Sequence, residues 1–242
     1  VFHIKDHVFL GTRFAAMDRA IFDALEIKAV VNLTAGASRV PNRFEAWGVQ
    51  YLHVELMDEL VTDPSQAVPM GVAALRRWGE DGLNVLVHCQ MGLSRSTLLV
   101  LAWLMRHAGL SLKAAAGLMV ERRGRRPKCN PSFWFYLAAL ERELHGWGPC
   151  REPSFNFLPW LVEDLGEMGM NFSKHQIEEA VRKEADWVTF ASFYTALSGT
   201  GFKKLMAAQS IAQKPPPEVQ SPTSARLCRR AAETAAAPPP AG

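Results

Sequence analysis

A cysteine and an arginine lie six positions apart, across a glycine, directly after an apolar stretch. The segment reads VLVHCQMGLSRS from Val85 to Ser96. Packing explains its first three residues but not Cys89, Gly92 and Arg95 at this spacing. A strand that ends in a glycine turn and leads into a helix points several backbone N–H groups at one position, and this geometry binds anions.

The side chains around this turn suit phosphate chemistry. The Arg95 guanidinium can grip a phosphate with two parallel hydrogen bonds. The positive field of the turn favours the thiolate form of a cysteine placed inside it, and the thiolate is the nucleophilic form. The residues therefore predict that Cys89 faces the phosphorus of a bound monoester.

Strand and helix patterns alternate along the first part of the chain. Strands are predicted at residues 8–10, 29–33, 51–57 and 84–88. Helices are predicted at residues 14–25, 65–78, 94–107, 112–123 and 133–144. This alternation favours an α/β fold with a mostly parallel central sheet flanked by helices, and the catalytic loops should share one end of the sheet.

The segment from His88 to Ser96 resembles the H-C-x-x-G-x-x-R-S signature of cysteine-based phosphatases. Its S-R-S ending is typical of the dual-specificity branch. VFLGTRFAAMD, VVNLTAG, LAWLMRHAGLSLKAA and RRPKCNPSFWFYLAALE resemble further family segments, so the resemblance covers about residues 1–146. One departure is a shortened match around Asn130, on which no catalytic role is expected to depend.

The resemblance implies a role for each position of the signature. Cys89 is the expected nucleophile, which forms a phosphocysteine intermediate, and the Ser96 hydroxyl is expected to hydrogen-bond its sulfur. His88 is expected to give structural support rather than act as an acid or base. The expected phosphate-binding residues are Gln90, Met91, Gly92, Leu93, Ser94 and Arg95. The implied mechanism uses no metal and no other cofactor.

The leaving group of such a reaction needs a proton from a general acid. Asp58 follows the predicted strand 51–57, and its distance from Cys89 along the chain matches that of the general acid in small dual-specificity phosphatases. Glu59 and Asp63 are its rivals. Asp63 precedes Pro64, where it suits a helix cap instead.

The resemblance also bears on the substrate. Nothing matches the longer catalytic domain or the WPD loop of the larger tyrosine phosphatases, so a shallow pocket is implied. Such a pocket would admit phosphoserine and phosphothreonine as well as phosphotyrosine on a phosphorylated protein. The alternatives are a phosphoinositide phosphatase, which often has lysines in the loop, an RNA triphosphatase, which usually has Asn in place of Ser94, and a phospho-binding scaffold without turnover.

A basic run comprises Arg122, Arg123, Arg125, Arg126 and Lys128. It could steer a phosphorylated partner toward the site. The reading favoured for most of the run is a solvated helix end, where cations also suit the helix dipole.

The composition changes after the predicted catalytic domain of residues 1–146. Residues 147–205 are expected to form a small helical module, which resembles a degenerate EF-hand without calcium ligands and offers a surface for a protein partner. Residues 206–242 are rich in Pro and Ala, and we expect this tail to be disordered.

The overall composition is that of an ordinary globular protein. The 242 residues carry a formal net charge of +3, too little by itself to indicate nucleic-acid or membrane binding. No apolar run is long enough to span a bilayer. The cysteines lack metal-site or disulfide-framework spacing, so we expect a cytoplasmic protein, with a nuclear location also open. The first residue is Val1 rather than Met, which leaves open a preceding targeting segment.

Overall fold

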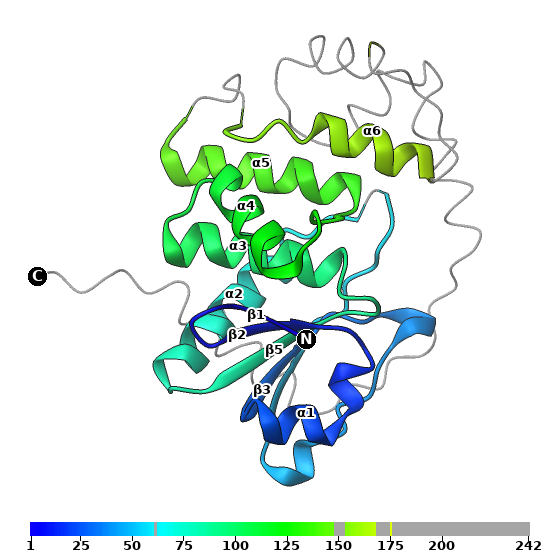
Figure 1. Ribbon diagram of the computed structural model, residues 1–242, viewed down its shortest axis with the longest axis vertical. Coiled ribbons are helices and arrows are strands. Elements are labelled where there is room, and N and C mark those ends of the chain that lie inside the picture. The colour runs from blue at the N-terminus through cyan, green and yellow to red at the C-terminus, as the bar shows by residue number, and fades with distance from the viewer. Residues whose placement is uncertain (61, 148–152, 168–174, 176–242) are drawn as a thin grey trace, which may run out of the picture.

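The fold is built on a five-stranded sheet. The computed structural model describes residues 1–60, 62–147, 153–167 and 175 (Figure 1). The strands are β1 (Phe2–Lys5), β2 (Val8–Gly11), β3 (Ile27–Asn32), β4 (Gln50–His53) and β5 (Asn84–His88), in the spatial order β1-β2-β5-β3-β4. Only β1 runs antiparallel to its neighbour β2, and the other pairs are parallel. The predicted α/β fold with a mostly parallel sheet is confirmed.

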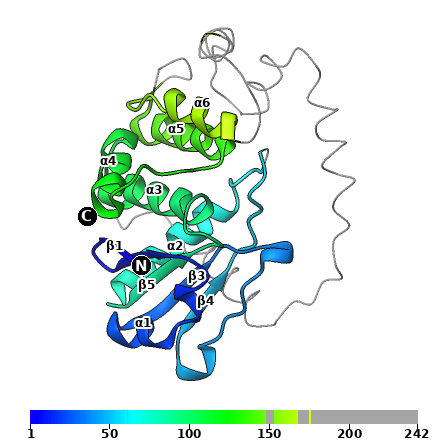
Figure 2. The ribbon, with the colours of Figure 1, turned by 45° about the vertical axis from the view of Figure 1, so that its right-hand side comes forward.

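The helices cover the two faces of this sheet unequally. They are α1 (Arg19–Ala24), α2 (Ala67–Glu80), α3 (Arg95–Ala108), α4 (Leu112–Arg123), α5 (Pro131–His145) and α6 (Leu158–Glu167). Figures 1 and 2 show α1 on one face, α2 and α3 on the other, and the later helices stacked beyond α3. This layering places α3 between the sheet and α5.

The central strand β5 shows why this arrangement forms. Its side chains alternate between faces, as in any strand. Val85 and Val87 belong to the large core that includes α3, whereas Leu86 packs in a smaller core with Phe22 of α1. Because β5 is buried on both faces, its sequence is a continuous apolar run rather than an alternating one.

Two predicted elements had wrong boundaries, and one strand was missed. The expected helix over residues 14–25 is divided at Asp18, whose extended backbone and side-chain bond to the amide of Ala20 start α1 afresh. The expected strand over residues 51–57 ends at His53, because its partner β3 ends at Asn32. Strand β1 was not predicted.

Helix α6 lies beyond the predicted catalytic domain of residues 1–146, yet it packs against α5. Trp134 of α5 stacks on Phe157 with ring centroids 5.8 Å apart. The ring of Trp160 in α6 lies 5.7 Å from the Trp134 ring. The predicted helical module of residues 147–205 falls mostly outside the described residues, and the predicted disordered tail falls entirely outside them. The domain boundaries stay predictions.

Candidate active site

The signature segment forms the connection between β5 and α3. Strand β5 ends at His88, and α3 begins at Arg95. Gly92 turns the loop with a φ of +66°, a conformation that side chains disfavour. A Cβ there would lie 2.6 Å from the carbonyl oxygen of Gly11, so the loop also passes too close to β2 for any larger residue.

The Cys89 thiol is held at the start of this loop. It is buried, and its Sγ lies 3.2 Å from the Ser96 Oγ in the first turn of α3. The first amides of a helix have no acceptor within the helix and point along its axis. The thiol therefore faces the positive end of α3, with the predicted hydroxyl contact in place.

Arg95 is a buried cation that is only partly satisfied by the protein. Its Nη1 donates to the carbonyl oxygens of Leu33 at 3.5 Å and Leu56 at 3.3 Å. Its Nε is buried and has no hydrogen-bond acceptor among the described residues, although the Asp58 carboxylate lies at an ion-pair distance of 3.4 Å. A buried donor without an acceptor is costly, and a bound anion would satisfy it.

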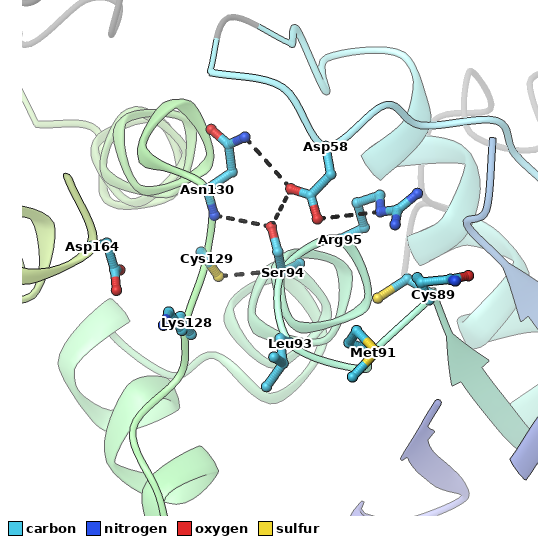
Figure 3. A pocket seen from close by; sticks show the side chains of 11 residues that line it. Asp58, Cys89, Met91, Leu93, Ser94, Arg95, Lys128, Cys129, Asn130 and Asp164 are labelled. Atoms are coloured by element: carbon cyan, nitrogen blue, oxygen red, sulfur yellow. Dashed lines mark hydrogen bonds and ion pairs between the residues drawn. The ribbon is translucent and has the colours of Figure 1, made fainter. Parts of the chain in front are cut away.

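Asp58 is fixed above the loop by three groups (Figure 3). The Ser94 hydroxyl donates to its Oδ1 at 2.6 Å, and the Asn130 amide donates to the same oxygen at 3.5 Å. The Asn130 backbone N–H in turn donates to the Ser94 hydroxyl at 3.0 Å. Together with Arg95, these contacts bring the predicted acid to the same pocket as the predicted nucleophile.

The two rival acids lie elsewhere. Neither Glu59 nor Asp63 is among the described residues that line the pocket. Asp63 accepts from the backbone N–H and the hydroxyl of Ser65, both at 2.9 Å. The suggested helix-cap role of Asp63 was wrong in detail, because α2 begins only at Ala67, after Gln66.

The pocket has a volume of about 350 Å³. It is lined by Asp58, Cys89, Gln90, Met91, Leu93, Ser94, Arg95, Lys128, Cys129, Asn130 and Asp164. Six of the residues predicted as nucleophile or phosphate-binding positions are in this set, whereas Gly92 and Ser96 are not. Figure 3 shows Cys89 at one end of the pocket and Asp164 at the other.

His88 is buried beside the nucleophile. Its Nδ1 lies 3.3 Å from the carbonyl oxygen of Cys89 rather than against the thiol. Burial lowers the pKa of His88 to about 4, so the ring is neutral at neutral pH. A neutral, buried ring is consistent with the predicted role of His88 in structural support, which stays a prediction.

Sequence reasoning missed two residues that support the loop. Arg123, assigned with the basic run to a solvated helix end, is buried, because it donates to the Gly92 carbonyl at 2.8 Å and the Thr97 hydroxyl at 3.1 Å. Arg122 and Arg125 are exposed, as predicted. The prediction was wrong for Arg126 and Lys128, which lie beyond the end of α4, are partly buried and pair with Asp164 and Glu167. Asn130 caps α5, and it also holds Asp58.

Two further features bear on the chemistry. No three His, Cys, Asp or Glu side chains of the described residues gather closely enough to hold a metal ion. The same residues include no helix that is long and apolar enough to cross a membrane.

Sequence comparison finds similarity to dual-specificity phosphatases. Residues 8–143 match the family model for the dual specificity phosphatase catalytic domain. Dual specificity protein phosphatase Mpk3 of Drosophila melanogaster is 32% identical over 137 residues, which are 56% of this chain and 32% of that protein. Human dual specificity protein phosphatase 26 is 34% identical over 139 residues, 57% of this chain and 65% of that protein. The chain thus spans less than two thirds of either relative.

Solved structures agree with this similarity. Human DUSP28 matches with a TM-score of 0.54 and 27% identity, over 60% of this chain and 99% of that one. A mouse putative dual specificity phosphatase, complexed with zinc tungstate, matches with a TM-score of 0.55 and 29% identity, over 60% of this chain and 88% of that one. Residues 8–143, which match the family model, contain the whole β5–α3 connection.

Proposed function

The chain belongs to the dual-specificity phosphatase family, and from this membership we propose that it is an active protein phosphatase. It hydrolyses phosphotyrosine, phosphoserine and phosphothreonine monoesters of proteins through a phosphocysteine intermediate. The observation that carries the proposal is the convergence of the Cys89 thiol, the Arg95 guanidinium and the Asp58 carboxyl on one pocket.

In the first step the Cys89 thiolate attacks the phosphorus of the bound monoester. The S–P bond forms while the bond from phosphorus to the ester oxygen breaks. Arg95 and the amides of the loop hold the non-bridging oxygens, where negative charge must be stabilised. Asp58 gives its proton to the departing oxygen, so the product leaves as an alcohol or phenol.

In the second step water attacks the phosphocysteine. The S–P bond breaks, inorganic phosphate forms, and Asp58 takes a proton from the attacking water. The Ser96 hydroxyl, 3.2 Å from the sulfur, donates a hydrogen bond to the thiolate as it departs. This contact stabilises the leaving sulfur and so favours breakdown of the intermediate.

The contact between Arg95 and Asp58 gives this cycle a natural starting state. Without substrate, Asp58 balances the buried guanidinium at 3.4 Å. A phosphate dianion can replace the carboxylate as the partner of Arg95, which releases Asp58 toward the leaving group. The tungstate named in the similar mouse structure is a tetrahedral oxyanion, and a tetrahedral oxyanion at this loop is what the proposal requires.

The test is initial turnover on phosphotyrosine and phosphothreonine peptides, a phosphoinositide and an aryl phosphate, with Cys89→Ser as the blank. We expect release from both peptides, no activity in the blank, and no effect of a chelator. Release from the lipid alone would make the chain a phosphoinositide phosphatase. No release from any substrate would favour the phospho-binding scaffold, and activity of Cys89→Ser would contradict the mechanism.

We also propose a location and a partner for this chain. The thiols of Cys89 and Cys129 are both free, which supports a reducing cytoplasmic or nuclear location. The region that follows α5 is proposed to bind a protein partner in addition to the phosphorylated substrate.

A further inference from the structure

Helix α6 lies outside the family match, which ends at residue 143, but it contributes to the pocket. Its Asp164 lines the end of the pocket that is farthest from Cys89 (Figure 3). Lys128, on the segment between α4 and α5, lines the same end. The pocket of this chain is therefore completed by an element that the family domain does not include.

The acidic face of α6 neutralises the cations of that segment. The Arg126 guanidinium forms two hydrogen bonds to Asp164, at 2.8 Å and 3.3 Å, and an ion pair with Glu163 at 3.0 Å. Lys128 is ion-paired with Glu167. Burial raises the pKa of Asp164, and the hydrogen bonds from Arg126 oppose that rise.

The charge count at this end of the pocket is therefore unfavourable to anions. Arg126 and Lys128 are paired with three carboxylates of α6, so neither offers a free positive charge to a bound ligand. Of these side chains, Lys128 and Asp164 line the pocket, but Asp164 is only 1% exposed, whereas Glu167 beside Lys128 is exposed. An acidic side chain of a substrate placed here would meet a net negative surface. Like charges a few ångströms apart repel each other even at a solvent-exposed protein surface.

We propose that α6 sets the substrate specificity of this phosphatase, with Glu167 selecting against phosphorylated segments that carry an acidic residue beside the phosphoresidue. The inference rests on the proposed function for its substrate class. The inference can be tested separately from the proposed function, because it concerns the ratio between two substrates rather than turnover itself.

The experiment uses two phosphotyrosine peptides that differ only in having Glu or Gln on both sides of the phosphoresidue. The full chain is expected to prefer the Gln peptide, as a ratio of kcat/KM. Glu167→Gln frees Lys128, so the ratio should move toward the Glu peptide by about threefold, the size expected for one partly exposed charge. The double variant Lys128→Gln/Glu167→Gln restores the original charge difference and should restore the original ratio.

Glu80→Gln is the matched control. Glu80 pairs with Arg76 on α2, four residues before β5 begins, and so lies at the other end of that strand from Cys89. This variant loses the same charge, and its ratio should stay that of the unaltered chain. An equal shift in Glu80→Gln and Glu167→Gln would overturn the proposal, because it would trace the effect to overall charge.

The same ratio is measured as Kd in the Cys89→Ser background, where phosphopeptide binds without turnover. Hydrolysis of an aryl phosphate by the unaltered chain tests the proposed function separately. If that hydrolysis is absent but the Kd ratio depends on the charge of the variant, the proposed enzymatic activity is overturned and the role of α6 stands. If hydrolysis is normal but the Kd ratio is the same for all variants, the proposed enzymatic activity stands and the role of α6 is overturned. Failure to bind either peptide would overturn both.

Discussion

At the scale of single residues, the candidate acid is held by contacts with distant parts of the chain. Asp58 is reached by Ser94 of the loop, by Asn130 before α5 and by Arg95 of α3. Ser94 and Asn130 both donate to its Oδ1, and Arg95 lies beside its Oδ2. The position of the acid thus depends on segments that are separated by up to 72 residues.

This geometry predicts how Asp58→Asn depends on the leaving group. A general acid contributes typically 10²–10⁴-fold, and only where the departing oxygen is basic. We expect kcat/KM, which reports the first step alone, to fall by roughly 10²-fold for a phenyl-type phosphate and to change little for a strongly activated aryl phosphate. Steady-state rates over a series of aryl phosphates would give the dependence.

Asp63→Asn is the control, because the Asp63 carboxylate binds Ser65 and does not line the pocket among the described residues. It should leave the whole series unchanged. A uniform fall across the series in Asp58→Asn, or a leaving-group dependence in Asp63→Asn, would contradict the assignment of the acid.

How far these residues could be predicted depends on where their partners lie. Cys89 and Ser96 belong to one short motif, so their contact follows from a strand, a turn and a helix in sequence. Asp58 needed the additional rule that the ends of parallel strands meet at one edge of the sheet. The contacts of Asn130 and Arg123 with this site depend on how α4 and α5 pack, which no local pattern in the chain specifies.

At the scale of elements, the loop between β5 and α3 is fixed by its close approach to β2. Gly92 combines a φ of +66° with a Cβ position only 2.6 Å from the backbone oxygen of Gly11. The signature glycine thus meets two separate demands, one on its own conformation and one on the space beside it. The motif in the sequence indicated the turn, but the crowding by β2 is a tertiary effect.

The two demands can be separated with a second glycine. Gly109 ends α3 with a φ of +65° and has no atom within 4 Å of its Cβ position. Gly109→Ala should lower the free energy of unfolding by about 1 kcal/mol, the usual cost of this conformation. Gly92→Ala should cost about 1–3 kcal/mol more, because the loop must move away from β2, and that movement should also lower turnover.

Urea unfolding of the two variants gives the difference directly. Equal losses of stability would show that conformation alone requires Gly92.

The errors in the predicted helix and strand boundaries also have local and tertiary causes. Asp18 divides the expected first helix through a local cap, and β4 stops where its partner strand β3 stops.

At the scale of the whole molecule, the segment 153–167 is joined to the catalytic fold by both polar and apolar contacts. The buried Glu141 of α5 accepts from the amide of Leu112 at 2.7 Å and from the amide of Ser154 at 2.8 Å. Phe157 is fully buried between Trp134 and Phe135 of α5. The change in composition after residue 146 marks a change in sequence character, but these contacts make α6 part of the same packed unit.

This packing predicts that α6 unfolds together with the sheet. Phe157→Ala should lower the free energy of unfolding by about 3–5 kcal/mol, the usual cost of removing a buried aromatic ring. Phe14→Ala, which removes a ring that is 59% exposed, should cost far less. If α6 belongs to the cooperative unit, the unfolding curves followed by near- and far-ultraviolet circular dichroism shift together in Phe157→Ala. A second transition, or an unchanged midpoint, would instead make α6 an independent element, and its Asp164 could then leave the pocket while the catalytic fold stayed intact.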